Sequence, residues 1–114
     1  MSGSPSERRN AVRYEVHAWV DMDDGHAHPH QLVHNLSLGG VCLQTDAVEE
    51  VGAGVDLKIT FPDLDGAHLE VRGTVVWVNR HPPVELGIRF SELDEAHRET
   101  LREYLRRTAH HRAG

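Results

Sequence analysis

The strongest fold signal in this sequence of 114 residues is the stretch VDLKITFPDLDG, residues 55–66. Its first part alternates apolar with polar side chains, which is the pattern of a β-strand with one buried face: Val55, Leu57, Ile59 and Phe61. The second part, Pro62-Asp63-Leu64-Asp65-Gly66, has the composition of a tight turn. Together they predict a hairpin that returns through a strand at residues 69–78.

The segments on either side of this hairpin extend the pattern. Apolar runs and alternation predict further strands at residues 14–22, 30–36, 41–45 and 85–90. Turn-forming residues predict a loop at residues 23–29 and a turn region at residues 46–54. At residues 91–108 the period becomes that of a helix, with a capping box at Ser91-Glu92-Leu93-Asp94 and an apolar stripe of Leu93, His97, Leu101, Tyr104, Leu105 and Thr108. Six short strands and one amphipathic helix predict an all-β fold with one C-terminal α-helix, a six-stranded antiparallel β-barrel.

Length and composition set the class of protein. The length favours one domain, and 39% hydrophobic with 26% charged residues is ordinary globular usage. The single cysteine, Cys42, lies in an apolar run and cannot form an internal disulfide. No stretch reaches the roughly 18 apolar residues of a membrane span, and the start MSGSPSERRN lacks the apolar part of a signal peptide. We therefore expect a cytoplasmic protein without membrane insertion, with a flexible lead at residues 1–6 and a frayed tail at residues 109–114.

The net charge of −6 is distributed unevenly along the chain. Residues 1–13 carry a net charge of +2, residues 14–92 a net charge of −9, and residues 93–114 a net charge of +1. The positive charge therefore lies at the two ends of an acidic body.

Two short motifs are candidates for ligand binding. Arg9-Asn10-Ala11-Val12-Arg13 precedes the first strand, and guanidinium groups suit bidentate contact with phosphate and stacking on flat rings. Asn35-Leu36-Ser37-Leu38-Gly39-Gly40 joins the second and third strands, where an amide and a hydroxyl could face a base edge. Taken singly, each motif also has a purely structural interpretation. The arginine motif could be a solvated basic tail, and the second motif could be an ordinary β-turn.

In combination, the order and spacing of these motifs resemble the PilZ domain of bacteria. The signature of that family is RxxxR followed by (D/N)xSxxG, and Gly73-Thr74-Val75-Val76-Trp77 and Leu86-Gly87-Ile88-Arg89-Phe90 resemble its closing strands. The resemblance covers residues 7–108, divided into an arm at 7–13, a barrel at 14–90 and a helix at 91–108. It implies a six-stranded β-barrel with a C-terminal helix that binds the second messenger cyclic di-GMP.

The resemblance also implies roles for individual residues. Arg9 and Arg13 would grip the phosphates and stack on guanine, while Asn35 and Ser37 would hydrogen-bond a guanine edge. Gly40 would permit the close turn. Three further residues are candidates for the same site: Arg8 and Gly39 as neighbours of the ligand, and Trp77 as either a contact to a base or a core residue. Asn at position 35 lacks the charge that Asp would bring to the guanine N–H donors.

The charge distribution favours a small ligand. Cyclic di-GMP carries two phosphate charges, which a few local arginines can neutralise even on an acidic body. A nucleic acid polymer draws its affinity from many phosphate contacts and would meet the net charge of −9, so we expect no such partner. The chain also has no regular ladder of aromatic residues for stacking successive bases.

The ten histidines raise the question of metal binding and catalysis. His26, His28, His30 and His34 could approach a zinc or nickel ion, or could simply lie exposed on a polar loop. We favour the polar loop and expect no metal site and no cofactor. Because His34 and Ser37 would lie on opposite faces of an extended strand and Cys42 reads as a core thiol, we expect no enzyme.

The sequence thus predicts a cyclic di-GMP receptor that signals to an unidentified effector protein. In this hypothesis the arm with Arg8, Arg9 and Arg13 folds over the turn at Asn35–Gly40 when the ligand binds. The alternative is an adaptor of the same fold that binds a protein partner and no nucleotide. The oligomeric state stays open.

Overall fold

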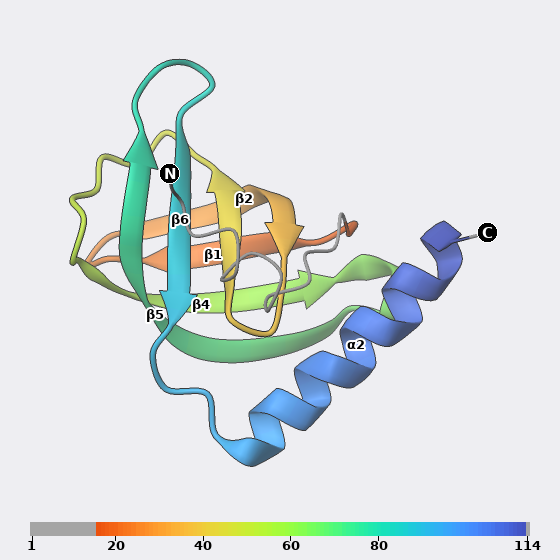
Figure 1. Ribbon diagram of the computed structural model, residues 1–114. Coiled ribbons are helices and arrows are strands. Elements are labelled where there is room, and N and C mark those ends of the chain that lie inside the picture. Colours follow the sequence, from red (N-terminus) through yellow and green to blue (C-terminus); the bar gives the residue numbers. More distant parts are fainter. Residues whose placement is uncertain (1–15, 114) are drawn as a thin grey trace, which may run out of the picture.

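The computed structural model describes residues 16–113, and the side chains of residues 16–108. Its strands are β1 (Trp19–Asp23), β2 (Ala27–Leu36), β3 (Gly40–Gln44), β4 (Gly54–Phe61), β5 (Ala67–Asn79) and β6 (Glu85–Phe90). A short 3-10 helix, η1 (Pro62–Leu64), lies between β4 and β5, and the helix α2 (Glu95–Ala113) follows β6. All strand pairs are antiparallel, and the strands close into a barrel in the order β1-β2-β3-β6-β5-β4 (Figure 1). The predicted fold class is confirmed.

The barrel interior is filled by the apolar residues that alternate along each strand. Val55, Leu57, Ile59 and Phe61 of β4 are all at most 3% exposed, as the alternation at residues 55–61 predicts. The helix α2 packs beside β5 and η1 and adds Leu101 and Leu105 to the same core (Figure 1). Tyr104 meets Phe61 edge to face, with ring centroids 5.1 Å apart. Among the described residues, no helix is long and apolar enough to cross a membrane.

The connection between the first two strands is a tighter hairpin than the loop expected at residues 23–29. β1 continues to Asp23 and β2 already begins at Ala27. The carboxylates of Asp23 and Asp24 accept the backbone N–H groups of Gly25 and His26 at 2.8 and 2.9 Å. These side-chain contacts satisfy the backbone of the turn, so that the two strands can extend into the predicted loop.

The helix begins and ends later than the predicted range 91–108. Asp94, not Ser91, caps its start, because the Asp94 carboxylate accepts the backbone N–H of His97 at 2.8 Å. The expected capping box at Ser91 is therefore wrong. A side-chain oxygen still caps the helix, but it belongs to Asp94, three residues further along the chain. At the other end the helix continues to Ala113, since the chain has neither glycine nor proline between residues 95 and 113.

Candidate functional site

The turn between β2 and β3 is built around the hydroxyl of Ser37. This oxygen accepts the backbone N–H groups of Gly39 and Gly40 at 3.1 and 3.2 Å and lies 3.4 Å from the carbonyl oxygen of Gly40, to which it donates. The backbone N–H of Ser37 donates to the same carbonyl at 2.9 Å. Because Ser37 is only 3% exposed, its hydroxyl is used inside the turn and shapes the loop.

The two glycines of this turn differ in how much space surrounds them. A Cβ on Gly40 would lie 2.2 Å from the carbonyl oxygen of Ile88, whereas a Cβ on Gly39 would have Ser37 Oγ as its nearest neighbour at 3.8 Å. Gly40 therefore lets β3 approach β6 closely, and Gly39 tolerates a side chain.

Four of the barrel's strands place one residue each in a row across the outer surface. In the strand register, Asn35 of β2 lies opposite Cys42 of β3, Cys42 opposite Gly87 of β6, and Gly87 opposite Trp77 of β5. The neighbours of these residues along the strands point into the core: Leu36, Val41, Leu43, Leu86 and Ile88. Alternation therefore turns the whole row, which we call the outer row, away from the core.

Trp77 of the outer row lies on the surface over a glycine. It is 39% exposed, so the core interpretation of this residue is wrong. A Cβ on Gly87 would lie 2.1 Å from Trp77 Nε1, which means that the indole occupies the space above Gly87. An irregularity in β5 between Val75 and Trp77 turns this aromatic residue outward, where its partly open ring offers an apolar surface.

Cys42 is a buried residue of the outer row. It is 4% exposed and lies between Val41 and Leu43, which both belong to the core cluster while Cys42 does not. Its burial agrees with the expectation of a buried thiol, and the strand register places it in the outer row beside Gly87.

Arg89 is a cation beside the turn that the sequence motifs do not include. It lies opposite Gly40 in the β3–β6 register and is exposed. Gly40 places no side chain beside Arg89. Only the pairing of β3 with β6 brings residues 40 and 89 together, so spacing along the chain cannot reveal it.

The arginines of the first motif lie outside the described residues. The approach of Arg8, Arg9 and Arg13 to the turn at Asn35–Gly40 therefore stays a prediction.

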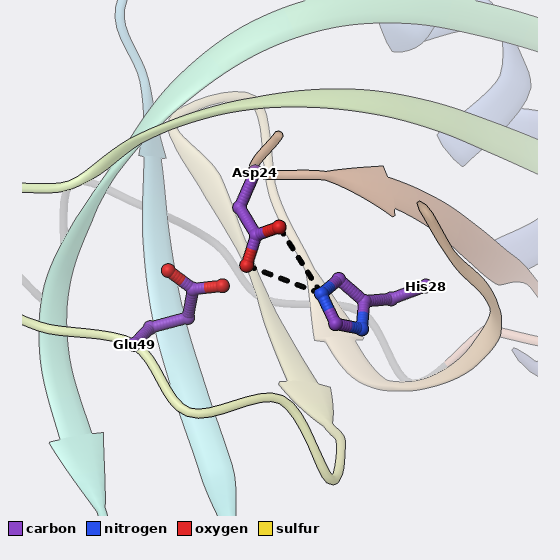
Figure 2. A group of neighbouring side chains, drawn as sticks. All are labelled: Asp24, His28 and Glu49. Carbon is purple, nitrogen blue, oxygen red and sulfur yellow. Dashed lines mark hydrogen bonds and ion pairs between the residues drawn. The ribbon is translucent and has the colours of Figure 1, made fainter. Parts of the chain in front are cut away.

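A second group of polar side chains joins the β1–β2 hairpin to the loop between β3 and β4. Figure 2 shows Asp24, His28 and Glu49, with His28 Nε2 3.1 Å from both carboxylate oxygens of Asp24. One donor atom from each of the three residues lies within 4.8 Å of the others. Burial and a hydrogen bond with Asp24 raise the pKa of Glu49 to about 7, and the same hydrogen bond holds the pKa of Asp24 well below its usual value. His28 belongs to the run of histidines visible in the sequence, whereas Glu49 belongs to no motif and has no sequence signal.

An open cavity of about 590 Å³ is lined by residues of β1, β2, β4 and β5 and by Glu92, which follows β6. Its wall has more carboxylates than cations: Asp21, Asp23, Asp56, Glu70 and Glu92 against Lys58 and Arg72. Such a wall repels an anion, so this cavity does not suit a phosphate-containing ligand.

Comparison of the sequence with protein families gives the decisive observation. The model of the PilZ domain matches residues 7–107. This chain belongs to the PilZ domain family. The turn built on Ser37 and the outer row are thus features of a PilZ barrel. Comparison with curated proteins finds no match.

Solved structures with the PilZ fold are similar to this chain at low sequence identity. The inhibitor of motility MotI/DgrA of Bacillus subtilis has a TM-score of 0.74 and 21% identity over 88% of this chain, which spans half of the length of that protein. The PilZ domain of YcgR from Escherichia coli, solved with c-di-GMP, has a TM-score of 0.73 and 12% identity, covering 91% of this chain and 93% of that one. The PilZ domain of CeSA from a cellulose-synthesizing bacterium has a TM-score of 0.60 and 13% identity, covering 82% and 94%. At these identities the likeness supports the fold.

Proposed function

We propose that this protein is a receptor for cyclic di-GMP that binds the dinucleotide on the outer row. The observation that carries the proposal is the row itself, in which Asn35 and the partly exposed Trp77 flank Cys42 and the side-chain-free Gly87 on one surface. Membership of the PilZ family and a neighbour solved with c-di-GMP support this choice of ligand.

Trp77 and Asn35 divide the recognition of guanine between them. The indole provides a flat apolar surface on which a base can stack, and such stacking contributes roughly 1–3 kcal/mol per base. The Asn35 amide holds both an acceptor and donors for a guanine edge. An amide accepts a hydrogen bond without negative charge, so it attracts the guanine N–H donors less than a carboxylate and also repels the phosphates less.

The phosphates are bound by arginines, with Arg9 and Arg13 as the main contacts and Arg8 beside them. Arg89 adds an exposed positive charge opposite Gly40. Four local cations outweigh the two charges of the ligand, whereas a long polyanion would extend over the acidic remainder of the barrel.

Ser37 and Gly40 act as positioning residues. The buried Ser37 hydroxyl holds the turn through three hydrogen bonds, and Gly40 lets that turn lie against β6. We infer that both set the place of Asn35 and leave the ligand contacts to their neighbours.

Signalling follows from ordering of the arm that carries Arg8, Arg9 and Arg13. When the phosphates draw these arginines onto the outer row, the surface around Trp77 changes, and a partner protein in the cytoplasm reads the change. The nucleotide is bound and released without chemical turnover.

Calorimetric titration of the full chain with cyclic di-GMP tests this function. We expect saturable binding that weakens at least tenfold in Arg9→Ala, Arg13→Ala and Trp77→Ala, and less strongly in Asn35→Ala and Arg89→Ala. Arg107→Ala, which removes an exposed arginine on α2, is the matched control and keeps the wild-type affinity. Chromatography of the nucleotide after incubation is expected to recover it intact.

The outcomes separate the proposal from its alternatives. A flat titration with wild-type protein overturns the receptor function and favours the adaptor that binds only a protein. Equal losses in Arg107→Ala and Arg9→Ala overturn the local site, because they indicate attraction by total charge. Hydrolysis of the nucleotide overturns the assignment as a non-enzymatic receptor.

A further inference from the structure

Glu49 is a buried carboxylate with one oxygen that the rest of the described structure leaves unsatisfied. The residue is 5% exposed, and its Oε2 atom is buried without a hydrogen-bond partner among the described residues. A buried polar atom without a partner costs roughly 1–3 kcal/mol, and more when it is charged. Such an atom indicates either a proton or a cation that satisfies it.

Two further donors lie beside this carboxylate. Figure 2 shows the carboxylate of Asp24 and the imidazole of His28 on the side toward which Glu49 points. Donor atoms of all three residues lie within 4.8 Å of one another. The side chains of Asp24 and His28 are 16% and 27% exposed, so the group is screened from bulk water on most sides.

Hydrogen bonds hold the backbone both in the β1–β2 hairpin turn and in the loop that carries Glu49. Asp24 Oδ1 accepts the backbone N–H of His26 at 2.9 Å, which orients its carboxylate in the hairpin turn. On the other side, Arg80 donates to the carbonyl oxygen of Glu49 at 3.2 Å. The loop that carries Glu49 is further joined to β5 by hydrogen bonds of Gly52 and Ala53 with Val75. The three donors therefore converge on a fixed framework.

We propose that Asp24, His28 and Glu49 bind a divalent first-row transition-metal ion, with Zn²⁺ as the best fit. Two carboxylates and one imidazole form a mixed oxygen and nitrogen set, which suits these ions better than Mg²⁺ or Ca²⁺. Donor atoms of a tetrahedral zinc site lie about 3.4 Å apart at bond lengths of about 2.0–2.2 Å. The donor atoms of these three residues already lie within 4.8 Å of one another, so small side-chain movements bring them to that spacing. Water completes the coordination on the open side.

The metal would join two connections that are far apart in the sequence. Asp24 and His28 belong to the β1–β2 hairpin, and Glu49 belongs to the loop between β3 and β4. The ion neutralises Glu49 and ties this loop to the hairpin. The site takes only His28 from the run of histidines at residues 26–34. His30 instead contacts Trp19, and His34 pairs with Glu85. The site also departs from the expectation that the chain binds no metal, and it does not depend on the proposed nucleotide site.

The test is metal titration of the chelator-treated full chain, followed by calorimetry and thermal unfolding. The probes are Zn²⁺ and Mg²⁺ alone, and circular dichroism checks that each variant is folded. We expect one Zn²⁺ site that raises the melting temperature and whose affinity falls at least tenfold in Glu49→Gln, Asp24→Asn and His28→Gln. Mg²⁺ is expected to bind far more weakly.

Matched controls separate this site from zinc adsorbed on the surface histidines. Glu50→Gln removes the neighbouring exposed acid, and His30→Gln and His34→Gln remove histidines of the same run. All three are expected to retain the wild-type Zn²⁺ affinity and thermal shift. The proposal is overturned if the wild-type protein shows no thermal shift, if Glu49→Gln binds Zn²⁺ as tightly as wild type, or if the His30 and His34 variants cause the loss instead.

Discussion

Gly40 faces the backbone of Ile88 so closely that a methyl group on Gly40 would lie 2.2 Å from the Ile88 carbonyl oxygen. Backbone atoms cannot move aside as the end of a side chain can. The approach of β3 to β6 therefore depends on the missing side chain at position 40, directly beside the turn that Ser37 shapes.

Gly40→Ala is expected to destabilise the barrel and to weaken cyclic di-GMP binding together. The clash with backbone costs about 2 kcal/mol or more in free energy of unfolding, because β3 must move away from β6. Urea unfolding measures this loss. Gly39→Ala is the matched control and changes the free energy of unfolding by less than about 0.5 kcal/mol. Equal stability of the two variants would contradict the close contact.

Gly87→Ala is expected to displace the indole of Trp77. The new Cβ would lie 2.1 Å from Nε1, so the ring must leave the space above position 87. In a Trp19→Phe background, the fluorescence of the remaining Trp77 reports this movement, and nucleotide affinity falls roughly tenfold as the stacking surface is lost. Gly54→Ala, whose Cβ would meet only the end of the Arg72 side chain at 3.5 Å, serves as control. Unchanged fluorescence would mean that Trp77 does not cover Gly87.

Asp94→Ala is expected to lower the melting temperature and to speed amide exchange in the first turn of α2. The Asp94 carboxylate accepts the His97 N–H at 2.8 Å, and alanine leaves that donor without its cap. Ser91→Ala removes the hydroxyl of the residue that the sequence favoured as cap. A larger drop in melting temperature for Ser91→Ala than for Asp94→Ala would contradict Asp94 as the helix cap.

Glu49 makes the stability of the metal-free protein depend on pH. Burial raises the pKa of Glu49 to about 7 in the folded chain, against 4.5 for an ordinary glutamate. The stability that protonated Glu49 contributes is complete below pH 4.5 and is lost as the pH rises through about 7. In chelator, the melting temperature of the wild type should therefore fall between about pH 5 and about pH 8 relative to that of Glu49→Gln. Glu50→Gln is expected to follow the wild type, and parallel curves for all three proteins would contradict the shift.

Local sequence pattern was sufficient for most of the barrel. Alternation along residues 55–61 identified β4, and the predicted bounds 85–90 agree with β6 (Glu85–Phe90). These segments are readable because the side-chain period of a strand is set by its own backbone and one face meets the core. The helix start was misplaced because Ser91 and Asp94 both suit a cap, and only the path of the chain after Phe90 selects between them.

The candidate sites were less accessible to sequence reasoning. Asn35 and Trp77 are 42 positions apart and meet in one row only through the pairing of β2, β3, β6 and β5. An isolated tryptophan in an apolar strand also suits a core, and the irregularity at Val76 that turns Trp77 outward has no sequence signal of its own. In the sequence, Glu49 is one acidic residue in a predicted turn region. Only the folded structure shows that it is buried beside Asp24 and His28.

The order of polar and apolar residues along the chain was enough to predict six strands and one helix. The resemblance to the PilZ family came from two short motifs and their spacing. Closure of the barrel settled the rest: which residues face outward together, why Gly40 and Gly87 must lack side chains, and that Glu49 is buried against Asp24. The physical reason is that alternation is a property of each strand alone. Lateral register, burial and the close approach of distant backbones arise only when hydrogen bonds and the shared core hold all six strands in one arrangement.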